Sequence, residues 1–352
     1  MTKQEAKRSY QMSKRAESSA QTERSIFEAT ATLWCERPFN DILSSGKPDF
    51  PFCLCWANEN WTRRWDGNNE EILLEQKYSH QDDIEHIRSL IPAFKDPRYI
   101  RINNKPLFLV YRSHLLPAPK ETVKIWREEA QKAGLDGIYL ARVEDYHSVM
   151  NGLSAKDFDF DADIEFPPFG WKISNVRFRS PLAKFLYKTG FLPKQLIENT
   201  IIDYEKMVKG MLKRPPSEST RFHCVTPSWD NSARRKKGAN IFTDSSPDIY
   251  EAWLRETVKK TVENTQKEEH VVFINAWNEW AEGNHLEPDL KWGHAYLKAT
   301  KRALQNIQAP PLINKGIKKN ASSSFHYKTL YWSLIGSINK NLKLFKYIKF
   351  WK

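Results

Sequence analysis

The order of apolar segments along this chain of 352 residues constrains its fold more than any other feature. Six short runs have the length and the branched or aromatic content of buried β-strands, and most are followed by a helical pattern. The runs span Pro51–Ala57, Pro106–Arg112, Gly137–Val143, Phe158–Phe166, Phe222–Ser228 and His270–Trp277. The helical patterns are clearest over Glu121–Ala133, Lys194–Lys213, Pro247–Lys267 and Gly293–Ile307. This alternation predicts an α/β fold in which helices cover a parallel sheet.

The number of βα units falls short of a closed barrel. An eight-stranded barrel needs about 250 residues and eight βα units, and six units are visible. Residues 1–48 would have to supply the first two, yet Met1–Arg24 is too polar for a buried parallel strand and only Ile26–Trp34 is partly apolar. We therefore expect a (β/α)8 TIM-barrel-like fold that is incomplete at its N-terminus. Its parts are a divergent polar segment (1–35), the barrel domain (36–308) and a basic aromatic tail (309–352).

The distribution of charge argues against a nucleic-acid-binding protein. The 13 tryptophans would suit either a carbohydrate or a nucleic-acid surface, and the net charge is +12. However, 13 lysines and arginines and no acids follow Asp289, so the first 290 residues carry 42 basic and 43 acidic groups. Binding to phosphates needs a basic patch on the folded body. A nearly neutral body therefore predicts no nucleic-acid partner.

The tail Phe325–Lys352 combines aromatic and branched residues with regularly spaced lysines. Such a basic amphipathic helix can make peripheral contact with an anionic membrane or dock on the protein's own exterior, and the linker Ala321–Ser324 favours the membrane. The segment Met1–Arg24 lacks the apolar core of a secretory signal, and no apolar run is long enough for a spanning helix. We expect a cytoplasmic protein, which either binds at the inner face of the membrane or stays free of it.

Neither the four cysteines nor the nine histidines predict a metal site. Cys35, Cys53, Cys55 and Cys224 lack the spacing of a zinc pair or a disulfide framework, so we expect reduced and mostly buried thiols. The histidines show no metal-ligand spacing, and no Ser-His-Asp or Cys-His signature is visible. We therefore expect neither a metal nor another cofactor.

Two glutamates follow the sixth apolar run. Glu279 and Glu282 stand three residues apart in Asn275–Gly283, and they face one side only if the chain turns there, which Gly283 permits. One carboxyl of such a pair can donate a proton to a glycosidic oxygen while the other acts as base or nucleophile. The alternative is a surface loop with two solvated acids beside core tryptophans. Residue types alone leave both interpretations open.

Tryptophan, amide and acidic side chains also follow the first and fifth runs. Indole rings stack on sugars, and amides and carboxylates hydrogen-bond to hydroxyls. Because the C-terminal ends of parallel strands meet at one edge, we expect a sugar-binding rim there. A packed loop in which Arg63 or Arg64 pairs with Asp66 is the alternative. The candidate rim residues are Trp56, Asn58, Glu59, Trp61, Trp65, Asp66, Asp230, Asn231, Trp277 and Asn278.

Acids occupy alternate positions along Asp157–Glu165, which would place them on one face of a strand. One interpretation is a DxD-type site that holds a divalent cation against a nucleotide sugar. The favoured alternative is that the first acids face solvent and only Glu165 approaches the rim. Short acidic repeats are weak signals, and no glycine-rich phosphate loop accompanies this one.

Four segments resemble the WbsX-type family of bacterial surface-polysaccharide proteins, which carries the label glycosyltransferase. They are Phe52–Gly67, Pro97–Tyr99, Trp229–Arg235 and Phe273–Gly283, and the resemblance extends over roughly residues 36–305. That family is similar to the glycoside hydrolase family 99 barrel, whose members include endo-α-mannosidases. Its members carry a further N-terminal section with the first barrel strands, and Met1–Leu33 does not resemble it.

The resemblance implies roles for individual residues. In the hydrolases an Asn-Glu-Trp-x-Glu-Gly motif carries both catalytic carboxylates, and this motif falls on Asn278–Gly283. By analogy Glu282 is the acid/base at the glycosidic oxygen, and Glu279 assists through the sugar 2-hydroxyl in a metal-free, retaining mechanism. The analogy also implies that Trp56, Asn58, Glu59, Asp66, Asp230 and Asn231 line the sugar cleft.

We therefore expect a glycosyltransferase-like enzyme of O-antigen (lipopolysaccharide) or capsule biosynthesis that uses an oligosaccharide or a lipid-linked saccharide. Two alternatives stay open. One is a retaining endo-α-mannosidase-like glycoside hydrolase, which could share the paired-glutamate site because a glycosyl group can pass to water as well as to a sugar. The other is an inactive, truncated glycan-binding remnant.

Overall fold

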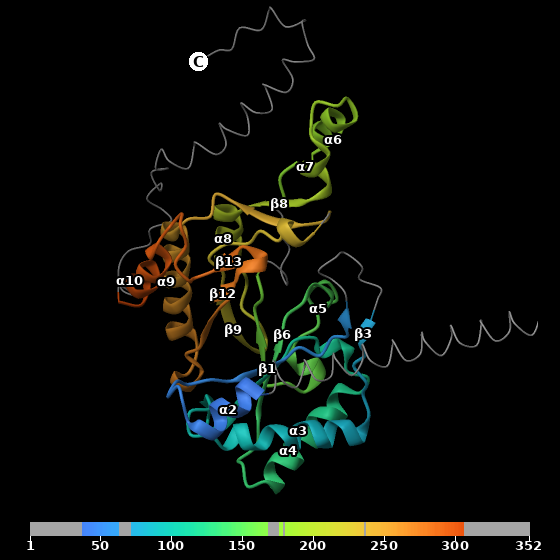
Figure 1. The fold of residues 1–352 in the computed structure, drawn as a ribbon, viewed down its shortest axis with the longest axis vertical. Coiled ribbons are helices and arrows are strands. Elements are labelled where there is room, and N and C mark those ends of the chain that lie inside the picture. The colour runs from blue at the N-terminus through green and yellow to red at the C-terminus, as the bar shows by residue number, and fades with distance from the viewer. Residues whose placement is uncertain (1–36, 63–71, 168–175, 179, 236, 306–352) are drawn as a thin grey trace, which may run out of the picture.

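The computed structural model describes residues 37–62, 72–167, 176–178, 180–235 and 237–305 (Figure 1). One sheet contains six parallel strands, and each strand overlaps one of the six predicted runs. In spatial order they are β1 (Leu54–Trp56), β5 (Lys105–Val110), β6 (Tyr139–Val143), β7 (Ala162–Ile164), β9 (Thr220–Val225) and β11 (Val272–Ile274). A short strand β4 (Arg101–Ile102) pairs antiparallel with β5. The curled sheet forms a half-barrel, which confirms the predicted α/β, barrel-like class.

The two faces of the sheet bury different sets of side chains, as the two-residue period of a strand requires. On one face, residues such as Leu107, Ala141 and Phe222 pack against one another. On the other face, Phe108 and Leu140 pack against the helices α3 (His80–Lys95) and α4 (Pro119–Lys132). Val225 packs in the cluster that includes residues of α8 (Tyr204–Leu212), α9 (Pro247–Asn264) and α10 (Ala295–Gln305).

Helices and short 3-10 turns connect the strands. They are α2 (Arg37–Ser45), α3 (His80–Lys95), η3 (Ser113–Leu115), α4 (Pro119–Lys132), α5 (Tyr146–Met150), η4 (Ala155–Phe158), α6 (Pro181–Lys188), α7 (Lys194–Glu198), α8 (Tyr204–Leu212), η5 (Ser232–Arg234), α9 (Pro247–Asn264), η6 (Lys267–Glu269) and α10 (Ala295–Gln305). The start of α9 is specified locally, because the Ser246 side chain accepts a hydrogen bond from the Ile249 backbone N–H and Pro247 occupies the first turn.

The helix predicted over Lys194–Lys213 is wrong. A strand, β8 (Thr200–Asp203), separates α7 from α8 and pairs in parallel with β10 (Asn240–Thr243). Three residues of the strand, Thr200, Ile201 and Ile202, are β-branched and favour extended backbone. Asp203 then accepts a hydrogen bond from the Lys206 N–H at 3.1 Å, so α8 begins with its own N-cap.

The acids of Asp157–Glu165 do not share one environment. Asp157 closes a capping box with Ser154 at the start of η4. Asp163 is buried and lies 2.7 Å from the Arg142 guanidinium, so the expectation that the acids before Glu165 face solvent is wrong for Asp163. A strand of a sheet that is covered by helices has no solvent-facing side, and a buried arginine stabilises the carboxylate instead.

Several predicted features lie outside the described residues. They are the polar segment 1–35 with Cys35, the side chain of Trp61, the residues Arg63, Arg64, Trp65 and Asp66, and the tail Phe325–Lys352. Of the cysteines in the described part of the chain, Cys224 is buried and Cys53 half-buried, whereas Cys55 is exposed, and all three are free thiols. Among the helices that the structure describes, none is long and apolar enough to cross a membrane.

Candidate functional site

The paired glutamates lie in a small hairpin that follows β11. Strand β12 (Asn278–Glu279) pairs antiparallel with β13 (Asn284–His285), and the 3-10 turn η7 (Trp280–Glu282) connects them. Gly283 ends this turn in the left-handed region, with φ of 57°. The predicted turn at Gly283 is therefore confirmed, and it allows both carboxylates to project from one compact loop.

The hairpin is fastened to the loop that follows β9. The Asp230 N–H donates to the Glu282 carbonyl at 2.7 Å, and the Ser228 hydroxyl donates to the Gly283 carbonyl at 2.5 Å. The backbone at Gly283 lies so close to Asp230 that a Cβ atom there would be 3.0 Å from the Asp230 carbonyl oxygen. Two of the predicted clusters, from different strand ends, thus meet in one site.

Glu282 occupies an environment suited to a carboxyl group that carries a proton. Its side chain is only 12% exposed, and it forms an ion pair with Arg234 of η5. Burial raises the pKa of Glu282 above its usual value; the Arg234 charge opposes this shift and the Glu279 charge adds to it. Glu279 itself is exposed. The two carboxyl groups therefore differ in burial, as an acid and its assisting partner often do.

Three tryptophans near the hairpin have different surroundings. Trp277 and Trp280 are 53% and 50% exposed, whereas Trp229 is buried in the core. The Trp280 ring stacks on His285 with centroids 3.7 Å apart, and its indole N–H donates to Glu287 at 2.5 Å. Trp277 and Trp280 can therefore offer ring surface to a sugar, and Trp229 cannot.

The amide and acid predicted beside Trp229 also differ. Asn231 is buried, and its side-chain oxygen accepts a hydrogen bond from the Asn240 N–H at 2.9 Å, which holds the start of β10. Asp230 is exposed, and its carboxylate accepts from the Ser232 N–H at 2.9 Å. Asn278 is exposed on the hairpin. Asp230 and Asn278 are thus accessible to a ligand, while Asn231 supports the loop.

The cluster after β1 has mainly structural contacts. Trp56 packs against His86 and Trp126 in the core. Asn58 is fully buried, and its amide accepts from the Arg112 N–H at 2.8 Å and donates to the Arg112 carbonyl at 2.9 Å. Glu59 forms an ion pair with the Arg112 guanidinium at 3.1 Å. This cluster therefore connects the end of β1 to the end of β5. The backbone of Trp61 continues into β2 (Trp61–Thr62), which pairs with β3 (Ile72–Leu74).

Not all predicted rim residues come together. Strands β1 and β11 stand at opposite ends of the sheet order, so the cluster after β1 and the hairpin after β11 flank the rim from its two sides. The loops after β9 and β11, by contrast, are in direct contact. The sugar-binding role of the rim residues stays a prediction.

A buried ionic cluster that sequence reasoning missed lies between β6, β7 and β9. Arg214 contacts Glu144 at 2.6 Å and Glu165 at 3.1 Å, and His223 contacts Glu165 at 3.1 Å. Burial alone would raise the pKa of Glu165, but the hydrogen bond and charge of His223 and the charge of Arg214 bring it below its usual value. Glu165 is thus held as a carboxylate.

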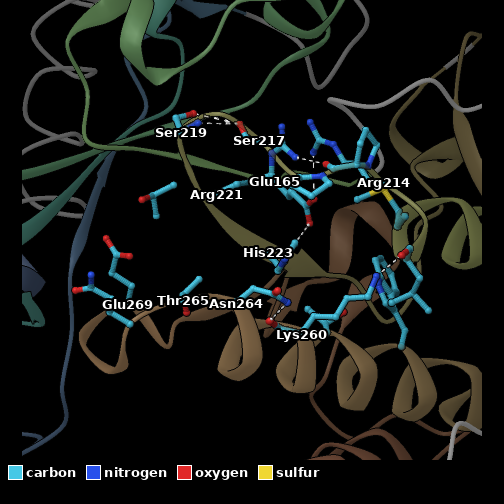
Figure 2. A pocket seen from close by; sticks show the side chains of 18 residues that line it. Glu165, Arg214, Ser217, Ser219, Arg221, His223, Lys260, Asn264, Thr265 and Glu269 are labelled. Carbon is cyan, nitrogen blue, oxygen red and sulfur yellow. Dashed lines mark hydrogen bonds and ion pairs between the residues drawn. The ribbon is translucent and has the colours of Figure 1, made fainter.

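Glu165 and its partners line a pocket of about 510 Å³ between β9, the segment after α8 and the end of α9 (Figure 2). Figure 2 shows Arg221 and His223 from the strand and Lys260 and Asn264 from the helix around this space. Only Glu165 of this group was singled out from the sequence. The alternation of polar residues in Thr220–Val225 is the one signal that could have indicated a polar wall there.

These observations define an α/β protein with a parallel half-barrel and a carboxylate pair at the C-terminal rim of its sheet. Comparison with known proteins gives the family: residues 27–300 match the family described as glycosyltransferase WbsX, and the chain belongs to it. The protein WxcX of Xanthomonas campestris pv. campestris is 39% identical over 291 residues, in each of two strains. That match covers 83% of this chain, and the chain spans 40% of the length of WxcX.

Two solved structures resemble this chain at low sequence identity. A glycoside hydrolase-like protein is 12% identical with a TM-score of 0.46, over 80% of this chain and 78% of its own. The GH99 endo-alpha-mannosidase from Bacteroides thetaiotaomicron is 15% identical with a TM-score of 0.40, over 73% of this chain and 74% of its own.

Proposed function

We propose that this chain is a glycosyl-transferring enzyme of bacterial surface-polysaccharide synthesis, O-antigen or capsule, in which Glu282 is the acid/base and Glu279 assists. The observation that carries the proposal is the environment of Glu282. Its carboxyl group is nearly buried and its pKa is raised by that burial, yet it lies three residues from an exposed second carboxylate. A protonated and an ionised carboxyl group are what glycosidic bond cleavage requires.

The chemistry then follows in two steps. Glu282 donates its proton to the glycosidic oxygen as the bond from that oxygen to the anomeric carbon breaks, and Glu279 accepts the proton of the 2-hydroxyl, whose oxygen assists at the anomeric carbon. An acceptor hydroxyl next attacks the anomeric carbon as the bond that this carbon formed with the 2-oxygen breaks. The acceptor gives its proton to the Glu282 carboxylate, and Glu279 returns its proton to the 2-oxygen. Arg234 pairs with the Glu282 carboxylate and stabilises the ionised form between the steps.

The proposed subsite around the pair uses the accessible groups of the same rim. Trp277 and Trp280 offer half-exposed rings, and Asp230 and Asn278 offer polar groups to sugar hydroxyls.

We also propose a lipid-linked saccharide as substrate and peripheral contact of Phe325–Lys352 with the inner face of the membrane. Sedimentation of the full chain with anionic vesicles tests that contact; vesicle binding that survives replacement of the tail lysines by glutamine would contradict it.

Substitution of the glutamates tests the catalytic roles. Glu282→Gln and Glu279→Gln should each lower turnover at least ~100-fold, because removing a positioned acid or base costs about 10²–10⁴ in rate, while saccharide binding persists. Glu287→Gln is the matched control, since its amide oxygen can still accept the Trp280 indole N–H. The measurement is product formation from α-mannosyl oligosaccharides, with and without an activated glycosyl donor.

The outcomes separate the alternatives. Turnover only with the activated donor supports the transferase, and release of reducing ends without it supports a hydrolase of the endo-α-mannosidase kind. A parent protein that binds saccharide but turns nothing over, like both glutamine variants, would identify a glycan-binding remnant and overturn the proposal.

A further inference from the structure

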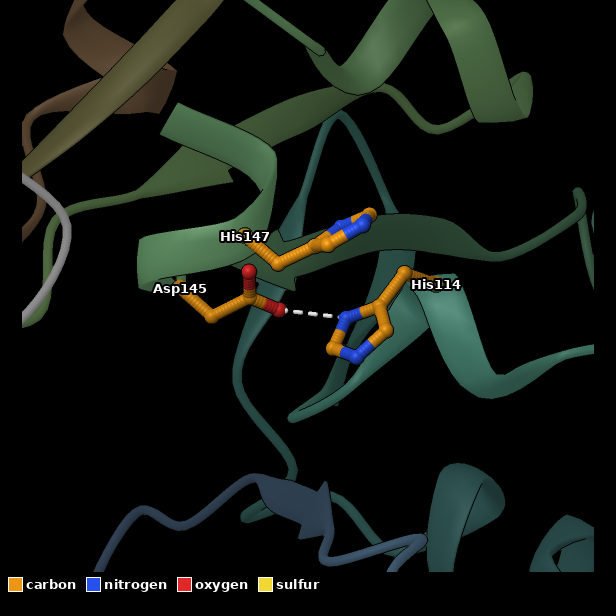
Figure 3. Close-up of side chains that lie close together, drawn as sticks. All are labelled: His114, Asp145 and His147. Carbon is orange, nitrogen blue, oxygen red and sulfur yellow. Dashed lines mark hydrogen bonds and ion pairs between the residues drawn. The ribbon is translucent and has the colours of Figure 1, made fainter. Parts of the chain in front are cut away.

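Three potential metal ligands meet at the ends of two neighbouring strands. His114 lies in η3, after β5, and Asp145 and His147 lie at the start of α5, after β6. Strands β5 and β6 are paired in parallel, so their C-terminal ends are adjacent. Figure 3 shows the three side chains turned toward one another. They are 31 and 2 residues apart in sequence, which is why the spacing of histidines did not predict them.

The ligand atoms of this trio are close enough to share an ion. One atom from each of the three residues lies within 4.8 Å of the others, and His114 Nδ1 is 2.6 Å from Asp145 Oδ2. The Asp145 side chain is 2% exposed and its other oxygen accepts from the Ser148 N–H at 2.7 Å, which fixes the carboxylate. His147 is exposed, so water can reach the remaining coordination positions.

The charges around His114, Asp145 and His147 are compatible with a bound cation. Arg112 is the cation beside the trio, 3.9 Å from Asp145, but its guanidinium is also paired with Glu59 at 3.1 Å. Arg142, further inside, is neutralised by Asp163 at 2.7 Å. Arg112 is thus shared between two carboxylates, and it offsets the negative charge of Asp145 only in part.

We infer that His114, Asp145 and His147 form a binding site for a divalent transition-metal ion of the Zn²⁺ class. Two imidazoles and one carboxylate are a donor set that suits such ions, with metal–ligand distances of about 2.0–2.2 Å and water in the open positions. The ion replaces the proton between His114 Nδ1 and Asp145 Oδ2, and this 2.6 Å contact opens slightly to admit it. This site is separate from the proposed catalytic pair, which follows β11.

Metal binding by the full chain tests the inference without any substrate. After chelator treatment, equilibrium dialysis against Zn²⁺ should give one bound ion per chain. His147→Ala and Asp145→Asn should each weaken binding at least ~10-fold; the asparagine keeps an oxygen for the Ser148 N–H, so α5 keeps its cap. His294→Ala, at an exposed histidine elsewhere, is the control and should bind like the parent.

Cobalt substitution identifies the donor atoms. Co²⁺ in this site should give a visible ligand-field spectrum without thiolate charge-transfer absorption, because the three free thiols in the described residues are not ligands. No saturable Zn²⁺ binding, or one equivalent that persists in both trio variants, would overturn the inference. In that case the group is a hydrogen-bonded His114–Asp145 pair on which His147 stacks, with ring centroids 4.9 Å apart.

Discussion

At the residue scale, side chains of the same type at the rim differ in burial and therefore in what they can contact. Asn58 and Asn231 were both predicted to contact sugar, yet both are buried and bond to backbone groups, whereas Asn278 is exposed. Sequence identifies the residue types that suit a sugar site. It does not determine which of them point outward, because that depends on backbone partners such as Arg112 and Asn240, 54 and 9 residues away.

His86 shows how burial controls the pH dependence of stability. It packs on Trp56 with ring centroids 4.3 Å apart, its Nε2 has no hydrogen-bond partner among the residues that the structure describes, and burial lowers its pKa from 6.5 to about 4. Between these pH values the unfolded chain binds a proton that the folded chain does not, so stability falls as pH decreases. From these values we expect His86 alone to remove about 2 kcal/mol of unfolding free energy between pH 7 and pH 5.

Urea unfolding of parent and variants at the two pH values measures this effect. His86→Phe should lose about 2 kcal/mol less stability on acidification than the parent, because phenylalanine keeps the aromatic packing without a titratable nitrogen. His294→Ala, which removes an exposed histidine, should behave like the parent. Equal acid sensitivity of His86→Phe and the parent would show that His86 is not the titrating group.

At the element scale, regular elements were predictable and their junctions were not. All six parallel strands fall on predicted apolar runs, since a strand covered on both faces must be apolar nearly throughout. The segment Lys194–Lys213 was misassigned because Ile201 and Ile202 fit a helical pattern as well as a strand, and the pairing partner β10 lies some 40 residues further on. The hairpin β12–β13 was anticipated only as a turn at Gly283.

The contact between the β11 hairpin and the β9 loop gives a prediction for Gly283→Ala. Alanine at positive φ costs about 1–2 kcal/mol of stability at any site, but at Gly283 its Cβ would also lie 3.0 Å from the backbone oxygen of Asp230. Gly190→Ala is the matched control, with φ of 79° and no atom within 4 Å of the added Cβ. We expect the Gly283 variant to lose roughly 1–2 kcal/mol more than the control, within the range for overpacking.

Chemical denaturation measures the two losses, and saccharide binding reports on the displaced loop. Because the Asp230 N–H is hydrogen-bonded to the Glu282 carbonyl, displacement of the loop at Gly283 should also weaken saccharide binding. Equal destabilisation by the two alanines would mean that the two loops are not in rigid contact.

At the scale of the whole molecule, buried charges connect parts of the chain that sequence reasoning could not link. Arg214 donates to Glu144 and Glu165, which lie 70 and 49 residues before it, and Arg221 reaches Glu144 across 77 residues. The nearly neutral charge of the first 290 residues gave no sign that these groups pair inside the protein. Predicting them would have required the order of β6, β7 and β9 in the sheet together with the course of the segment after α8.

This cluster should make Arg214 one of the most sensitive positions of the fold. Its side chain is 5% exposed, and so are those of both carboxylate partners. Arg214→Met leaves Glu144 with its contact to Arg221, and Glu165 with its contacts to His223 and the Cys224 backbone N–H. We expect a loss of about 3–5 kcal/mol of unfolding free energy, because each buried carboxylate loses its Arg214 partner. Arg127→Met is the control: that pair with Asp161 is about one-third exposed, and its loss should stay within about 1 kcal/mol.

The pH dependence of the Arg214→Met deficit separates a charge effect from a packing effect. Burial already raises the pKa of Glu144 in the parent, and loss of the guanidinium raises it further, so protonation relieves the unpaired carboxylate as pH falls. The difference in unfolding free energy between parent and variant should therefore shrink from pH 7 toward pH 5. A deficit that stays constant over this range would mean that Arg214 stabilises the half-barrel through packing of its stem and not through its charge.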